Sequence, residues 1–125
     1  MRILFAAPDR DLLECYKAIL EADGYEVTTA FDGTVVLSLL ADRCFEAVIL
    51  DLNIPRVEHA RIAARAAEKN IPVIILSSEP EGSKGQLGAH LRYPFDPERL
   101  ESVISSVTGK AEPEKKGFES VTEYE

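Results

Sequence analysis

The chain has 125 residues, of which 46% are hydrophobic and 29% are charged, and its formal net charge at pH 7 is −8. This composition is typical of one globular domain and excludes a membrane-spanning segment, because no apolar stretch approaches the ~20 residues that a bilayer requires. The acidic balance argues against nucleic acid as a partner, since its phosphates would be repelled.

The first half of the chain alternates short apolar runs with helical patterns. Residues 3–6 and 25–30 are predicted strands. Gly24 ends the helix between them, and either Asp9 or Asp11 can cap the start of that helix. A second helical pattern follows the second strand.

The most informative run covers residues 45–55, where four apolar residues lead directly into Asp51. A continuous apolar run predicts a strand that is buried on both faces, as in a parallel sheet. The carboxylate that ends this strand then lies at the C-terminal edge of the sheet, where open α/β folds bind their ligands. Asp51 is therefore the first candidate functional residue.

The second half continues with a helix over about residues 58–69, a buried strand over 72–76 and a weak fifth strand over 89–92. Asp96 is the expected N-cap of a last helix. Repeated βα units predict an α/β fold of the flavodoxin-like class. Its five-stranded parallel sheet is doubly wound, with helices on both faces, because each crossover returns right-handed.

Two segments break this rhythm. Residues 78–88 contain one Pro and three Gly, which destabilise a helix by about 3 kcal/mol and roughly 1 kcal/mol each. The fourth helix is therefore expected to be missing or reduced to a loop. Residues 109–125 are polar and charged, which predicts a flexible tail or linker after a domain of residues 1–108. The sequence leaves open whether an output domain follows residue 125.

This order of elements resembles a response-regulator receiver domain over about residues 2–107. The resemblance rests on the residues around Asp51, on the run 71–77, and on residues 88–89 leading to 94–95. In that family an acidic pair after the first strand and the third-strand Asp bind Mg²⁺, and the Asp accepts a phosphoryl group. A hydroxyl after the fourth strand and a Lys before the fifth-strand Pro bind the phosphate. An aromatic residue on the fifth strand transmits the change to a partner-binding face.

Carried onto this sequence, the resemblance places the phosphoacceptor at Asp51 and the phosphate-binding hydroxyl at Ser77. The acidic pair falls on Ala7 and Pro8, neither of which can bind a metal. Asp9 lies one position further on and could at most replace the pair in part. As an N-cap, Asp9 would have a purely structural role instead.

The Lys position is occupied by Tyr93 and the aromatic switch position by His90. Phosphoryl transfer needs positive charge to screen the incoming anion from the carboxylate, and Mg²⁺ held by carboxylates ordinarily supplies it. A tyrosine hydroxyl can donate one hydrogen bond but carries no positive charge. The resemblance therefore implies a pseudo-receiver, which keeps the fold and loses the phosphorylation switch.

Three functions are compatible with an α/β fold of this kind, and the sequence supports them unequally. The first is a non-enzymatic signalling module that needs no cofactor and acts through protein partners such as signalling or output proteins. The second is a phosphorylation-competent receiver that uses Asp51, with Asp9 helping to hold Mg²⁺. The third, a small α/β enzyme or nucleotide binder, has no support, because no glycine-rich phosphate loop follows the first strand.

The two cysteines, Cys15 and Cys44, are too few for a disulfide framework and too isolated for a metal site. Reduced thiols, together with an N-terminus that runs directly into a strand, favour a cytoplasmic protein. The oligomeric state is left open by the sequence.

Overall fold

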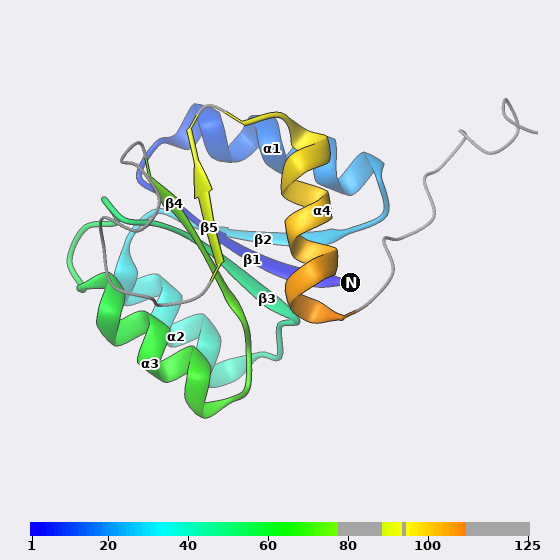
Figure 1. Ribbon diagram of the computed structural model, residues 1–125. Coiled ribbons are helices and arrows are strands. Elements are labelled where there is room, and N and C mark those ends of the chain that lie inside the picture. The colour runs from blue at the N-terminus through cyan, green and yellow to red at the C-terminus, as the bar shows by residue number, and fades with distance from the viewer. Residues whose placement is uncertain (78–88, 94, 110–125) are drawn as a thin grey trace, which may run out of the picture.

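The computed structural model describes residues 1–77, 89–93 and 95–109. Five parallel strands form one sheet in the order β2-β1-β3-β4-β5 (Figure 1). The strands are β1 (Arg2–Ala6), β2 (Glu26–Ala30), β3 (Ala47–Asp51), β4 (Val73–Ser77) and β5 (Ala89–Arg92). The helices are α1 (Arg10–Ala22), α2 (Gly33–Asp42), α3 (His59–Glu68) and α4 (Pro97–Thr108). The predicted flavodoxin-like class is confirmed.

Two of the predictions concern residues outside this part of the chain. The missing fourth helix was expected at residues 78–88, and the tail or linker at 109–125, of which only Gly109 is described. Within the described residues, no helix is both long and apolar enough to cross a membrane.

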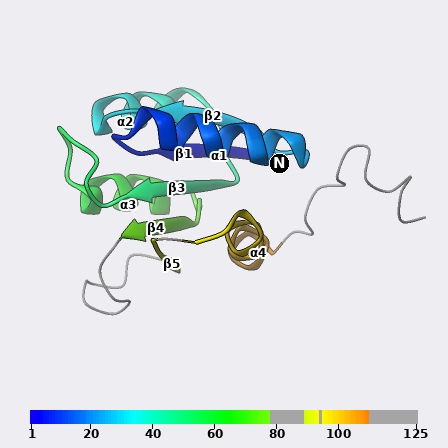
Figure 2. The same cartoon turned by 90° about the horizontal axis from the view of Figure 1, so that it is seen from above.

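Helices cover both faces of the sheet, with α1 and α4 on one face and α2 and α3 on the other (Figures 1 and 2). The central strand β3 contacts both layers, because successive side chains point to opposite faces. Ala47 and Ile49 belong to the core under α1 and α4, whereas Val48 and Leu50 belong to the core under α2 and α3. All of β3 is buried, as its continuous apolar run predicts.

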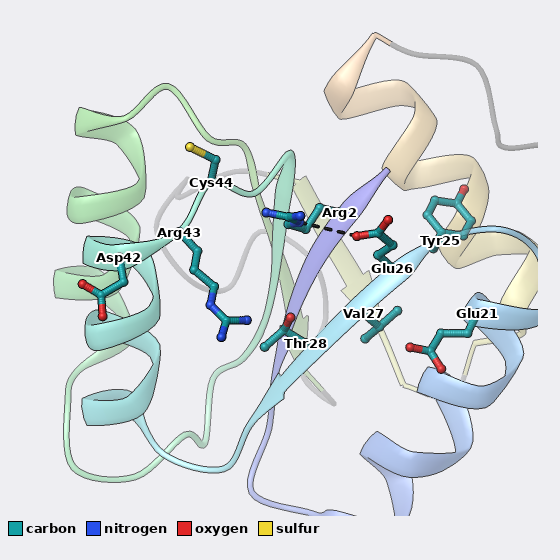
Figure 3. Close-up of a pocket in the computed structure, with 9 residues that line it drawn as sticks. All are labelled: Arg2, Glu21, Tyr25, Glu26, Val27, Thr28, Asp42, Arg43 and Cys44. Carbon is teal, nitrogen blue, oxygen red and sulfur yellow. Dashed lines mark ion pairs between the residues drawn. The ribbon is translucent and has the colours of Figure 1, made fainter.

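The two outer strands of the sheet are β2 and β5. A hollow of about 900 Å³ lies along the outer side of β2 (Figure 3). It is bordered by the end of α1 at Glu21 and by the end of α2 at Asp42 and Arg43. The helices therefore leave part of this outer strand uncovered.

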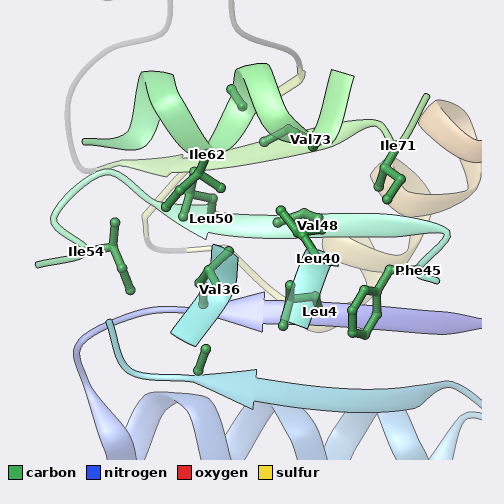
Figure 4. Packing of buried hydrophobic residues seen from close by; sticks show 14 of the residues in the cluster. Leu4, Val36, Leu40, Phe45, Val48, Leu50, Ile54, Ile62, Ile71 and Val73 are labelled. Atoms are coloured by element: carbon green, nitrogen blue, oxygen red, sulfur yellow. The ribbon is translucent and has the colours of Figure 1, made fainter. Parts of the chain in front are cut away.

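The core on the α2 and α3 side shows how the strands and helices interlock (Figure 4). Val36 and Leu40 of α2 and Ile62 of α3 are fully buried against strand residues that include Leu4 and Leu50. These helical residues recur at the spacing of one apolar stripe, which explains why the sequence pattern identified the helices.

Aspartates begin three of the four helices in the described residues. Asp9 Oδ1 accepts a hydrogen bond from the backbone N–H of Leu12 (3.1 Å), so the structure selects Asp9 over Asp11 as the cap of α1. Asp96 caps α4 in the same way, as predicted, and Asp32 caps α2. Each of these carboxylates satisfies an N–H that the first helical turn leaves without a partner.

The loops after β2 and β3 are held together at the C-terminal edge of the sheet. The N–H of Gly33 donates to the carbonyl of Pro55 (2.9 Å), and Arg56 forms an ion pair with Asp32 (3.6 Å). A Cβ on Gly33 would lie 2.5 Å from the Cβ of Val57, so only glycine allows this approach. The contact fixes the loop that immediately follows Asp51.

Candidate functional site

Asp51 is the last residue of β3 and is 8% exposed. Both of its carboxylate oxygens accept hydrogen bonds from within the chain. The backbone N–H of Asn53 donates to Oδ1 (2.7 Å), and the hydroxyl of Tyr93 donates to Oδ2 (2.9 Å). The carboxylate is thus satisfied by its own loop on one side and by a residue 42 positions later on the other.

Tyr93 reaches Asp51 because it extends the pairing of β4 and β5. Its backbone N–H donates to the carbonyl of Ser77 (2.9 Å), one step beyond the pair of Ser77 and Arg92. Burial raises the pKa of the Tyr93 hydroxyl far above its usual value, and the charge of Asp51 and the hydrogen bond to it raise that pKa further. Tyr93 is therefore a neutral, permanently protonated donor at physiological pH.

The ring of Tyr93 is fixed by a series of aromatic contacts that lead away from the site. It stacks on Phe95 (centroids 5.3 Å apart), and Phe95 contacts Tyr16 of α1 (5.2 Å). The Tyr16 hydroxyl donates to the carbonyl of Phe95 (3.0 Å), and burial also raises the pKa of Tyr16. These contacts fix the ring whose hydroxyl reaches Asp51, because the neighbouring rings restrict its rotamers.

The end of β1 supplies the opposite side of the site and offers little to a cation. Ala7 is fully buried in the core under α1, and Pro8 is exposed; neither side chain has an oxygen. Asp9 is exposed, and its Oδ1 caps α1. The predicted cap role of Asp9 is therefore the one observed.

These side chains do not fit Mg²⁺. That ion requires near-octahedral oxygen coordination and is held in proteins by carboxylates. Asp51 is the one buried carboxylate at this edge in the described chain, and both of its oxygens already accept hydrogen bonds. Within the same described residues, no group of three or more His, Cys, Asp or Glu side chains could hold a metal ion.

Ser77 and His90 lie on the two strands beyond β3. Asp51 pairs with Leu76, so Ser77 extends one residue past Asp51 toward the C-terminal edge. His90 pairs with Ile75, one residue before the level of Asp51, and is half-buried. Its Nε2 is buried and has no hydrogen-bond partner among the residues that the structure describes. The fold thus brings Ser77 and Tyr93 to the edge where Asp51 lies and keeps His90 within the sheet.

Asn53 contacts Asp51, although the sequence pattern did not mark it as a functional residue. Its contribution is a backbone N–H, which donates to a carboxylate two residues earlier and so forms an Asx-type turn. An Asp followed two positions later by Asn, just after a strand, was the available signal.

Comparisons with known proteins agree with this fold. The family model for the response regulator receiver domain matches residues 3–104. The response regulator MprA of Mycobacterium avium (strain 104) is 27% identical over 122 residues, covering 91% of this chain and 54% of the relative. The transcriptional regulatory protein PrrA of Mycobacterium tuberculosis is 33% identical over 79 residues, covering 62% of this chain and 34% of the relative. The chain spans about half the length of MprA and about a third of the length of PrrA.

Solved structures show the same likeness. The chemotaxis response regulator CheY4 of Vibrio cholerae superposes with a TM-score of 0.75 at 26% identity, over 85% of this chain and 97% of that protein. A response regulator receiver domain protein from Clostridium thermocellum superposes with a TM-score of 0.77 at 27% identity, over 86% of this chain and 94% of that protein.

Proposed function

The chain belongs to the response regulator receiver domain family, and we propose that it is an atypical member, a pseudo-receiver that signals through protein partners without Mg-dependent phosphorylation of Asp51. The observation that carries this proposal is the 2.9 Å hydrogen bond from the Tyr93 hydroxyl to Asp51 Oδ2. A neutral donor occupies the oxygen that would otherwise meet a cation or a phosphoryl group.

Electrostatics explain why this donor does not replace a cation. A phosphoryl donor brings negative charge toward a carboxylate that is itself negative, and charge-neutralising groups lower that barrier. The Tyr93 hydroxyl stabilises the existing charge of Asp51 but does not neutralise an approaching anion. It also engages one lone pair of Oδ2 and so lowers the nucleophilicity of that oxygen toward phosphorus.

The β1 end of the site supports the same proposal. Ala7 and Pro8 stand where the family has its acidic pair, and Asp9 is engaged as the cap of α1. A cation would therefore have to compete with Tyr93 for Asp51 and find its remaining ligands in water. We expect any Mg²⁺ binding to be too weak to support phosphoryl transfer.

A receiver without this switch acts by presenting a folded surface to other proteins. MprA is described as a response regulator and PrrA as a transcriptional regulatory protein, which supports signalling or output proteins as the partner class and a cytoplasmic location. The proposal includes no catalytic turnover, no nucleic-acid contact by this domain and no cofactor.

The test is a ¹⁵N-HSQC titration with Mg²⁺ and then beryllofluoride, following the amides of Asn53, Ser77 and His90. We expect no saturable shifts in the native chain. A Pro8→Asp/Tyr93→Lys variant, which restores one acidic residue and the family's Lys, is the matched control and should gain Mg-dependent shifts. Saturable shifts in the native chain that spread from Asn53 to Ser77 would instead support the phosphorylation-competent receiver that uses Asp51.

A further inference from the structure

We propose that the outer edge of β2 docks a second copy of this chain, whose own β2 adds antiparallel to it across a two-fold axis. The resulting dimer would contain one continuous sheet. This inference goes beyond the proposed function and does not rest on it, because it is argued from the backbone and side chains of β2, an outer strand of the sheet.

The hydrogen bonds of β2 show which of its backbone groups are available. The N–H of Glu26 donates to the carbonyl of Met1 (2.8 Å), and the carbonyl of Ala30 accepts from Ala7 (3.1 Å), so the even-numbered residues of β2 bond to β1. In a strand, alternate residues direct their backbone groups to opposite sides. The N–H and C=O groups of Val27 and Thr29 therefore face outward, where the described residues provide no further strand.

Within β2, Glu26 at the first position is the only charged residue, and the strand contains no Lys, Pro or bulge. Edge strands commonly carry Lys, Pro or a bulge, which prevent pairing with another chain. The sequence of β2 is Glu-Val-Thr-Thr-Ala, regularly paired with β1 along its whole length. Its three central residues are β-branched and favour an extended, paired backbone.

Symmetry restricts the possible registers. A residue whose backbone groups face outward must oppose another such residue, so the two-fold axis passes through a residue and not between two. With the axis at Thr28, Val27 opposes Thr29 of the second copy, and the two exchange both hydrogen bonds. Thr28 then faces its own equivalent, and Tyr25 faces Phe31 of the second copy.

Exposed side chains favour this register. Phe31 directly follows β2 and is 37% exposed, although it is a large apolar residue. The guanidinium of Arg10 lies 4.4 Å from the centre of its ring. At the other end of β2, Tyr25, Val27 and Glu21 line the hollow of about 900 Å³ (Figure 3).

Pairing the two copies brings these opposite ends together. Phe31 of one copy would enter the hollow beside Tyr25 of the other, on the face of the sheet that α1 covers. Arg10, which accompanies that ring, would approach the carboxylate of Glu21. The apolar and charged contacts would each occur twice, as an isologous interface requires.

Cross-linking tests the register. In a chain whose exposed native cysteines are removed (Cys15→Ser/Cys44→Ser), Thr28→Cys would place two sulfurs across the axis. Residues in such a non-hydrogen-bonded pair have Cα atoms about 4.5 Å apart, within disulfide range. With oxidised glutathione, we expect a covalent dimer on a non-reducing gel. The control Glu26→Cys faces Ala30 of the second copy and should not cross-link.

Sedimentation velocity over a concentration series tests the surface itself. Phe31→Glu would place a carboxylate near Glu21 of the second copy and should raise the dimer dissociation constant at least about tenfold. Ser106→Glu adds the same charge on the exposed side of α4 and should leave the constant unchanged. A chain that is monomeric at every concentration, a dimer that survives Phe31→Glu, or equal cross-linking at residues 26 and 28 would overturn the proposal.

Discussion

The carboxylate of Asp51 and the outer edge of β2 both present polar groups at the border of the same sheet, but they differ in whether the chain itself supplies their hydrogen-bond partners. At Asp51, the chain supplies its own donors from Asn53 and Tyr93. At β2, the outward backbone groups of Val27 and Thr29 face no strand in the described part of the chain. A ligand at Asp51 would have to displace existing hydrogen bonds, whereas a partner at β2 would only complete missing ones.

The largest expected loss of stability comes from a proline on the side of β2 that bonds to β1, compared with one on its outer side. Thr28→Pro removes an N–H that bonds to β1, leaves a carbonyl of β1 without a donor, and should lower the free energy of unfolding by about 2 to 3 kcal/mol. Thr29→Pro removes an outward N–H and should cost about 1 kcal/mol or less, since no bond to β1 is lost. Urea denaturation at low protein concentration measures both. Equal losses would show that the outer side of β2 is engaged in the monomer.

A smaller loss of stability is expected at the Asp51 site. Tyr93→Phe removes the donor to a buried carboxylate and should destabilise the fold by about 1.5 to 3 kcal/mol, the range for hydrogen bonds to charged groups. Tyr16→Phe removes a neutral hydrogen bond to the carbonyl of Phe95 (3.0 Å) and should cost only about 0.5 to 1.5 kcal/mol. Denaturation midpoints in urea compare the two variants. If Tyr93→Phe lowers the free energy of unfolding by less than Tyr16→Phe does, the hydrogen bond from Tyr93 to Asp51 contributes little to stability.

The smallest expected effect is a dependence on alkaline pH. A tyrosine in the unfolded chain loses its proton near pH 10.0, and the pKa of Tyr93 is raised above this value in the folded chain, first by burial and then by Asp51. The contribution of Tyr93 to stability is therefore complete below pH 10 and is progressively lost as the pH rises above it.

Urea denaturation of the native chain and of Tyr93→Phe, at about pH 9 and about pH 11, measures this loss. The stability difference between the two proteins should be smaller at the higher pH. A difference that stays constant would mean that Tyr93 is not shielded from solvent by its position over Asp51.

Much of the site could be predicted from local patterns. The apolar run of β3 predicted where Asp51 would lie, and the helical pattern after Asp9 predicted an N-cap. The weak metal site at Ala7 and Pro8 was instead implied by the resemblance to the receiver family. The sequence indicated that the Tyr93 hydroxyl could donate one hydrogen bond but did not identify its acceptor. In the structure it donates to Asp51 itself, because the side chain of Tyr93 extends from the end of β5 back to the end of β3.

The sequence by itself determined the strands, the helices and the aspartate cap of α4, and it limited the cap of α1 to Asp9 or Asp11, because periodicity and capping depend on residues within a few positions of one another. The tertiary structure decided which distant groups meet: Tyr93 with Asp51, and the loop after β3 with Gly33. It also decided that β2 is an edge. Strand order follows from how the crossovers pack against both faces of the sheet, and that packing depends on contacts between distant segments, which local patterns do not specify.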